Sequence, residues 1–141
     1  MLGIFGRDGV FAATQWPLQD SEPFVQGALL MYRNFDGGKS SFGDTSVSAT
    51  SANVKDTSVY ASLDSTNPKR MVIVAINKTA NAITAVIKLS HASAFNQAHI
   101  YRLTSASSAP KAAGTQTLSN PAQFSYSMPP YSVSTLHLTK Q

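Results

Sequence analysis

The acidic residues come first among the groups that could do chemistry. Cleavage of a glycosidic bond requires two carboxyl groups that face each other, about 5 to 10 Å apart. The chain has a single glutamate, Glu22, and six aspartates. If the chain is catalytic, the candidate residues are Glu22, Asp8 and Asp36. Glu22 lies at an expected helix start, and both aspartates lie in turn-like sequences with glycine. The sequence therefore shows no evident complete catalytic pair, although folding can bring distant carboxylates together.

A second candidate is the stretch DGGKSSFGD, residues 36–44, which begins and ends with aspartate. Carboxylate and carbonyl oxygens suit calcium, so Asp36 and Asp44 are candidates for a metal site. An EF-hand loop, however, carries acidic or amide groups at alternate positions and a closing glutamate, whereas this stretch has Lys39 in its middle. The pattern favours a turn in which the aspartate side chains accept hydrogen bonds from nearby backbone amides.

No other stretch indicates a metal or nucleotide site, and we expect no cofactor. His91, His99 and His137 have none of the spacings of a zinc pair, and the chain has no cysteine. The three glycines within residues 3–9 lack the order of a dinucleotide-binding or P-loop motif. They are interpreted as structural glycines.

Trp16 is the candidate for sugar binding, because the apolar C–H face of a sugar stacks on an aromatic ring. It is the only tryptophan, and it lies in an irregular Gln-Trp-Pro context. The ring is either exposed there or fills an edge of the core. Exposed tyrosines would add stacking surface of the same kind.

Charge and hydropathy argue against nucleic acid and membranes as partners. The net charge is +4, but the basic residues are scattered singly except for Lys69 and Arg70. Phosphate binding needs several cations on one face. No run of about 18 apolar residues is present that could span a membrane. The start of the chain also lacks the basic and apolar regions of a signal peptide.

Residues 21–35 are expected to form one amphipathic helix. Asp20 or Ser21 would cap its start, and paired glycines after Phe35 would end it. The apolar stripe of this helix is expected to be Phe24, Ala28, Met31 and Phe35.

From residue 45 the hydrophobic period changes to two, which is typical of strands. We expect an all-β fold: an antiparallel β-sandwich of about seven to eight strands with one N-terminal α-helix. MVIVAI, residues 71–76, is apolar on both faces and is expected to be a central strand. SASSAPKAAGT, residues 105–115, is expected to be a break between strands. Two inner faces are expected at Ile83, Ala85, Ile87 and Leu89 and at Phe124, Tyr126 and Met128.

Three stretches carry a family resemblance: LGIFGRDGVFAATQW, MYRNFDGGKSSFGDTSV and VYASLD. Together they resemble sequences of glycoside hydrolase family 44, the endoglucanases and xyloglucanases. VIVAINKTANAITAVIKL is similar to the family's sandwich strands. The resemblance covers nearly the whole chain, but only the end of the much longer family sequence.

The resemblance implies a division of the chain. In the family, an (α/β)8 barrel holds both catalytic glutamates and a β-sandwich packs against it. Residues 1–16 would match the last barrel strand and its loop, the helix of residues 21–35 would match the last barrel helix, and residues 36–141 would form the sandwich. Residues 1–35 would then be a barrel remnant, and residues 32–47 would be the joint. Neither catalytic glutamate of the family has a counterpart here.

The resemblance also implies a function. The leading hypothesis is an extracellular module that binds or positions a β-glucan such as cellulose or xyloglucan, with Trp16 matching an aromatic residue that can line the sugar cleft. The alternative is a minimal endo-β-1,4-glucanase that uses its own carboxylates, and the second alternative is a non-binding scaffold fragment. The family's sandwich takes a further strand from outside this region. An unpaired sheet edge recruits another chain, so a homo-oligomer is expected.

Overall fold

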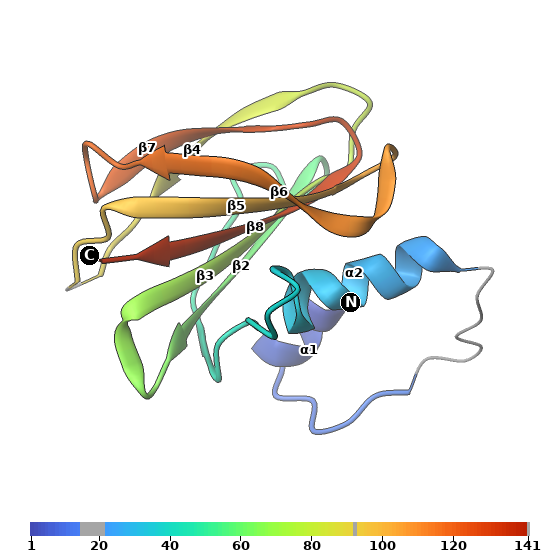
Figure 1. Ribbon diagram of the computed structural model, residues 1–141, viewed down its shortest axis with the longest axis horizontal. Helices are drawn as coiled ribbons and strands as arrows, with labels where there is room; N and C mark the ends of the chain where they lie inside the picture. Colours follow the sequence, from blue (N-terminus) through green and yellow to red (C-terminus); the bar gives the residue numbers. More distant parts are fainter. Residues whose placement is uncertain (15–21, 92, 141) are drawn as a thin grey trace.

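The computed structural model describes residues 1–14, 22–91 and 93–140, which form three layers (Figure 1). A six-stranded antiparallel sheet lies in the middle, two helices cover one of its faces, and a two-stranded sheet covers the other. The expected all-β antiparallel sandwich is therefore confirmed. No helix in the described ranges is long and apolar enough to cross a membrane.

The strand order of the large sheet places the last strand near its centre. The order is β1-β2-β3-β8-β5-β6, and every neighbouring pair is antiparallel. The strands are β1 (Thr45–Val47), β2 (Thr57–Asp64), β3 (Asn67–Asn77), β5 (Gln97–Thr104), β6 (Ser107–Thr117) and β8 (Ser132–Thr139). β8 thus joins the early strands β1 to β3 to the later hairpin of β5 and β6.

The small sheet consists of β4 (Ile83–Lys88) and β7 (Gln123–Met128), which pair from Ile83 with Met128 to Lys88 with Gln123. Their inner side chains close the main core, as the period of two predicted. On β7 these side chains are fully covered, because Phe124, Tyr126 and Met128 are 7%, 3% and 3% exposed. On β4 they are only partly buried. The core is therefore tighter beneath β7 than beneath β4.

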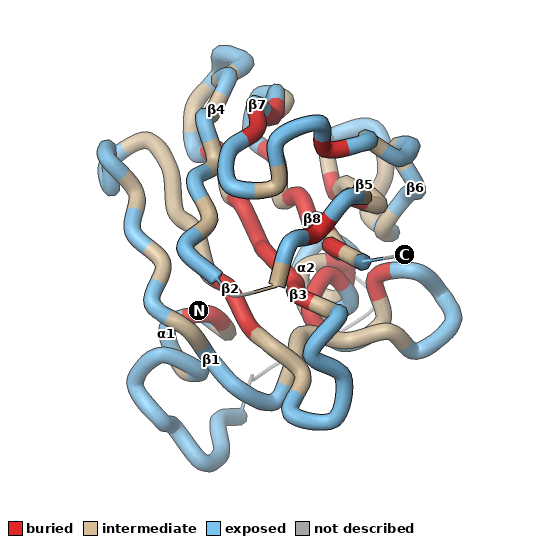
Figure 2. Tube along the Cα trace, turned by 90° about the vertical axis from the view of Figure 1, so that its left-hand side faces the viewer, coloured by how far each residue is buried: buried red, intermediate tan, exposed pale blue. Residues whose placement is uncertain are grey.

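β3 is buried on both faces, as expected for the apolar segment 71–76. Met71, Ile73 and Ala75 contribute to the core beneath the small sheet, whereas Val74 packs with Met31 of the helix layer. Figure 2 shows the buried residues gathered along the middle of the molecule, with exposed residues on the outer loops. A strand between two apolar layers needs no polar face, which explains its unbroken apolar sequence.

β6 corrects the expected break at residues 105–115. Alanine, proline and glycine are poor strand formers, so this segment has no strand signal of its own. It forms a strand because it lies at the edge of the sheet. Pro110 has no amide hydrogen to donate, and on an edge strand this missing donor does not deprive the neighbouring strand of a hydrogen bond. The register to β5 shifts at two places, and Gly114 has a φ of 101°. Such irregularities are common at sheet edges.

The helix layer differs in part from the expected pattern. α2 spans Pro23–Arg33, within the predicted 21–35, with Pro23 at its first position and Glu22 before it. Its buried residues are Gly27, Met31 and Tyr32, whereas Phe24 is 48% exposed. The contact stripe therefore runs through Gly27. A Cβ at this position would lie 2.0 Å from the backbone oxygen of Ser108, so α2 approaches β6 through a residue without a side chain.

A second helix, α1 (Leu2–Arg7), forms where the resemblance implied a barrel strand within residues 1–16. It packs against the end of the sheet at β1 and β2. A Cβ on Gly3 would lie 2.3 Å from the ring of Tyr60, so the helix contacts this ring through bare backbone. This contact supports the structural interpretation of that glycine.

Candidate functional site

The structure separates two of the candidate catalytic carboxylates. Glu22 precedes the first residue of α2 and Asp36 follows its end. The helix has 11 residues, which corresponds to about 16 Å at about 1.5 Å per residue. Paired carboxyl groups of glycosidases lie about 5 to 10 Å apart. Glu22 and Asp36 therefore cannot act together on one bond in this conformation.

Asp8 is held by its neighbour at the end of α1. Its Oδ1 accepts a hydrogen bond of 2.8 Å from Nε of Arg7, and both side chains are exposed. This hydrogen bond holds the pKa of Asp8 below its usual value. A general acid of a glycosidase needs a raised pKa so that it keeps its proton near neutral pH. Asp8 is thus an exposed ion-pair partner, with neither Glu22 nor Asp36 among its partners.

Asp36 caps the turn after α2, as the sequence indicated. Its Oδ1 accepts hydrogen bonds from the backbone amides of Gly38, at 2.8 Å, and Ser40, at 3.0 Å. Burial tends to raise its pKa, but the hydrogen bonds from Ser40 and Gly38 outweigh that effect and the pKa is lowered. Lys39, within this turn, has a φ of 73°.

Asp44 instead bridges to another part of the sheet. It accepts hydrogen bonds from the backbone amide and hydroxyl of Ser65, in the turn between β2 and β3, and the pKa of Asp44 is lowered as a result. Nearby, a Cβ on Gly43 would lie 2.0 Å from the backbone oxygen of Leu63. Asp36 and Asp44 thus hold separate turns. The described residues contain no group of three or more histidines and acidic residues that could hold a metal ion.

Trp16, the candidate sugar-binding residue, lies outside the described residues. Its role stays a prediction.

The structure brings together two histidines that sequence spacing did not pair. His99 of β5 lies opposite His137 of β8, with ring centroids 6.0 Å apart. The signal was available only in part: each histidine lies on the same strand face as residues that pack against the helix layer, but nothing local indicates that β5 and β8 are neighbours. Arg70 of β3 donates from Nε to Nε2 of His137 at 3.2 Å.

Burial and the nearby Arg70 and His99 lower the pKa of His137 to about 4. The ring is therefore neutral at pH 7 and can accept the hydrogen bond from Arg70. Arg70 also forms an ion pair with Asp64, at 3.2 Å, and donates to the backbone oxygen of Ser41. The cluster thus fastens the segment after α2 to the sheet, which is a structural task.

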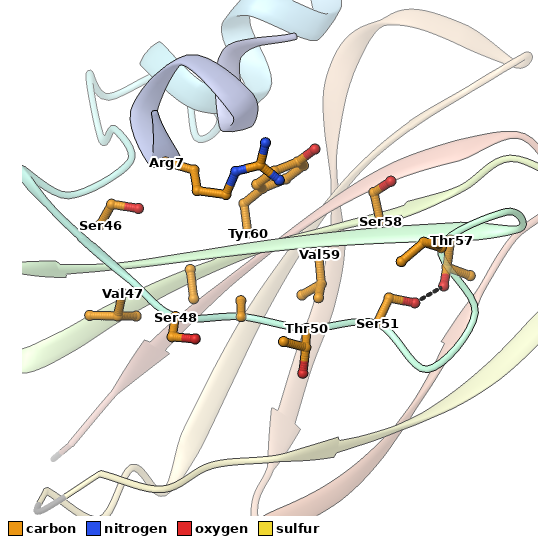
Figure 3. Close-up of a pocket in the computed structure, with 13 residues that line it drawn as sticks. Arg7, Ser46, Val47, Ser48, Thr50, Ser51, Thr57, Ser58, Val59 and Tyr60 are labelled. Carbon is orange, nitrogen blue, oxygen red and sulfur yellow. Dashed lines mark hydrogen bonds between the residues drawn. The ribbon is translucent and has the colours of Figure 1, made fainter. Parts of the chain in front are cut away.

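A surface hollow lies along the outer edge of β2, and we call it the hydroxyl groove (Figure 3). Its volume is about 690 Å³. α1 contributes Arg7, β2 contributes Tyr60, valine and alanine side chains supply apolar surface, and six residues supply hydroxyl groups. These are Ser46, Ser48, Thr50, Ser51, Thr57 and Ser58. One end is closed by a hydrogen bond of 2.5 Å between the hydroxyls of Ser51 and Thr57.

The hydroxyl groove exists because β1 is short. β1 pairs only with residues 61–63 of β2, so residues 57–60 have no strand partner on this side within the described chain. Backbone groups at such an edge can receive an extended segment, and the hydroxyl side chains can bond a ligand rich in hydroxyl groups. Tyr60 offers little stacking surface, because Gly3 of α1 covers its ring.

No protein-family model matches the chain. Endoglucanase A of Paenibacillus lautus is 33% identical over 132 residues, which are 93% of this chain and 19% of that protein. Among solved structures, a xyloglucanase of Paenibacillus polymyxa from glycoside hydrolase family 44 is 34% identical, with a TM-score of 0.94. The match covers 99% of this chain and 28% of that one.

A bifunctional glucanase-xylanase from a metagenome library is 37% identical, with a TM-score of 0.89, over 99% of this chain and 27% of that one. The chain thus spans from about a fifth to little more than a quarter of the length of these three proteins.

Proposed function

Because the chain belongs with glycoside hydrolase family 44 and spans part of the length of that family's enzymes, we propose that it is a module that binds or positions β-glucan. The observation that carries the proposal is the likeness to a xyloglucanase over 99% of the chain. Cellulose and xyloglucan are the proposed ligands, because the relatives are named endoglucanases and xyloglucanases. The proposed place of action is extracellular, where polymeric glucan is met.

Binding is favoured over catalysis by the placement of the carboxylates. Glu22 and Asp36 lie at opposite ends of α2, and Asp8 is an exposed partner of Arg7. A minimal endoglucanase would need two of them within about 10 Å. Release of reducing ends from xyloglucan or carboxymethyl-cellulose tests this point directly. Sustained turnover that is lost in Glu22→Gln would establish the catalytic alternative over the binding module.

Affinity electrophoresis through gels that contain xyloglucan or carboxymethyl-cellulose tests the binding function. The wild-type chain is expected to migrate more slowly than in a gel without polysaccharide. Trp16→Ala is expected to remove this retardation, because stacking on a ring supplies much of the contact in a sugar site. Phe11→Ala is the matched control, since Phe11 is fully exposed and has no proposed role. If no gel retards the wild-type protein, the binding function fails and the scaffold hypothesis remains.

The domain division is also a proposal. We place the boundary at residue 36, with residues 1–35 as a helical unit related to the end of a barrel and residues 36–141 as the sandwich. Its support is the run of tethers after α2, where Asp36, Ser41 and Asp44 each bond to the turn or the sheet. Residues 32–47 thus act as a joint.

A self-associated state is proposed on a separate observation: within the described chain, residues 57–60 of β2 have no strand partner on the side of the hydroxyl groove, whose facing wall is formed by residues 48–51. Residues 57–60 can pair with an extended segment of a second copy. Light scattering at micromolar concentration is expected to give a mass above that of a monomer. Ser58→Lys, which places a charge on this edge, is expected to return the mass to the monomer value, whereas Ser119→Lys on an exposed turn should not. A monomeric wild-type chain would overturn the proposal.

A further inference from the structure

A second, smaller hollow lies where α2 begins, beside the ends of β5 and β8. It is lined by Phe24, Leu103, Thr104, Ser105, Tyr131 and Val133, and its volume is about 220 Å³. We call it the aromatic hollow. It shares no residue with the hydroxyl groove or with the His99–His137 cluster.

Two aromatic rings at the aromatic hollow are unusually exposed. Phe24 is 48% exposed and Tyr131 is 65% exposed. The remaining lining divides into a buried apolar part and a polar part. Leu103 is 5% exposed and packs in the core beneath α2, whereas Thr104 and Ser105 supply hydroxyl groups.

The backbone at Tyr131 has the positive φ of the left-handed region. Its φ is 41°, a value that bulky residues rarely adopt. The conformation is held at the turn into β8 by a hydrogen bond of 2.9 Å from its amide to the backbone oxygen of Thr79. A residue such as glycine would adopt this φ without strain. An exposed tyrosine in such a position is a reason to look for a function of its ring.

The lining specifies the class of ligand. It contains no carboxylate, ammonium, guanidinium or imidazole group, so nothing in it compensates a charged ligand. Aromatic faces bind apolar C–H surface, and hydroxyl groups exchange hydrogen bonds with other hydroxyls. A neutral pyranose ring has both surfaces, and the volume suits one sugar unit better than a folded protein element.

We propose that the aromatic hollow is a binding subsite for a single glucosyl unit of a neutral β-glucan, with Tyr131 and Phe24 as the stacking rings. This inference rests on the proposed binding function and assigns residues to it that lie in the described structure. A polymer that is bound through one glucosyl unit at a time is held weakly, and its affinity does not depend on the pattern of its side branches.

The test uses the full chain in affinity gels with xyloglucan, which give an association constant from the change in migration with polysaccharide concentration. Tyr131→Ala is expected to weaken binding about fivefold to tenfold, the size expected for loss of one aromatic contact. Tyr131→Phe keeps the ring and is expected to bind like the wild type. Phe24→Ala is expected to weaken binding in the same direction. Phe11→Ala removes an exposed ring elsewhere and is expected to have no effect.

The outcomes separate this inference from the proposed function. If the wild type is retarded and Tyr131→Ala and Phe24→Ala bind equally well, the aromatic hollow is not a subsite, while the binding function stands. If the wild type is not retarded by any glucan, the binding function fails and the subsite fails with it. Thermal unfolding of each variant is measured alongside. Weaker binding by a Tyr131→Ala chain that unfolds at the wild-type temperature supports the inference.

Discussion

Lowering the pH from 7 to 5 is expected to destabilise the fold through His137. In the folded chain the pKa of this ring is lowered to about 4 by burial, Arg70 and His99. In the unfolded chain it returns to about 6.5. The unfolded state therefore binds more protons between these two values, and stability falls as the pH drops through this window. Protonation also removes the lone pair that accepts the hydrogen bond from Arg70.

The magnitude follows from the two pKa values. Linkage between about 6.5 and about 4 gives a loss of about 2 kcal/mol in the free energy of unfolding between pH 7 and pH 5. His137 keeps some contact with solvent, and solvent screening reduces the effect to about 1 to 2 kcal/mol. Asp36, Asp44 and Asp64 do not contribute in this window, because their pKa values are lowered from 3.8.

The assay is urea unfolding at a series of pH values for the wild type and His137→Gln. Glutamine has a side-chain oxygen that can accept the hydrogen bond from Arg70, but it does not titrate. The variant is expected to show a nearly flat stability between pH 7 and pH 5. His91→Gln is the control, because it removes a histidine outside the Arg70 cluster; a reduced slope in His137→Gln but not in His91→Gln assigns the effect to His137. Equal slopes for the wild type and His137→Gln would refute the argument.

Two further changes test the packing of the helix layer. Gly27→Ala is expected to destabilise the fold by about 1 to 3 kcal/mol in urea unfolding, because its Cβ would meet the backbone oxygen of Ser108 at 2.0 Å. The control is Gly6→Ala in α1, where nothing lies within 4 Å, and it should be neutral or stabilising by up to about 1 kcal/mol. Equal effects of the two substitutions would contradict the close approach of α2 to β6. Thr135→Val is expected to lower the free energy of unfolding by about 1 to 2 kcal/mol, because the Thr135 hydroxyl donates a buried hydrogen bond of 2.8 Å to the backbone oxygen of Met31. An unchanged midpoint of urea unfolding would show that this hydrogen bond contributes nothing to stability.

The hydrophobic pattern predicted two kinds of strand: those with one apolar and one polar face, and the strand that is apolar on both faces. The alternation in residues 83–89 and 123–128 identified both strands of the small sheet and their inner faces. The unbroken apolar run of residues 71–76 identified a central strand. In each case the local sequence predicts which side chains are buried, because each strand packs against a large apolar layer.

The missed features depend on neighbours that are distant in sequence. Residues 107–117 form a strand because β5 offers them a partner edge, not because of their own propensity. Gly27 carries the contact of α2 with β6, and an apolar stripe cannot reveal a contact made by a missing side chain. His99 and His137 meet only because β8 lies beside β5. Asp8 and Asp36 lie in turns and Glu22 directly precedes α2, as expected, but the separation of Glu22 from Asp36 depends on the length of α2.

The position of β8 between β3 and β5 has a consequence for how the protein is made. A ribosome delivers β1 to β7 before β8, so the nascent chain holds two separate halves of the large sheet. Until β8 arrives, the inner edges of β3 and β5 are unpaired, and the edge of β3 includes the apolar segment 71–76. Exposed apolar edges aggregate. Slow release of the last strand, or its loss by proteolysis, is therefore expected to yield aggregates rather than a partly folded domain, and a helper protein that shields β3 would raise the yield.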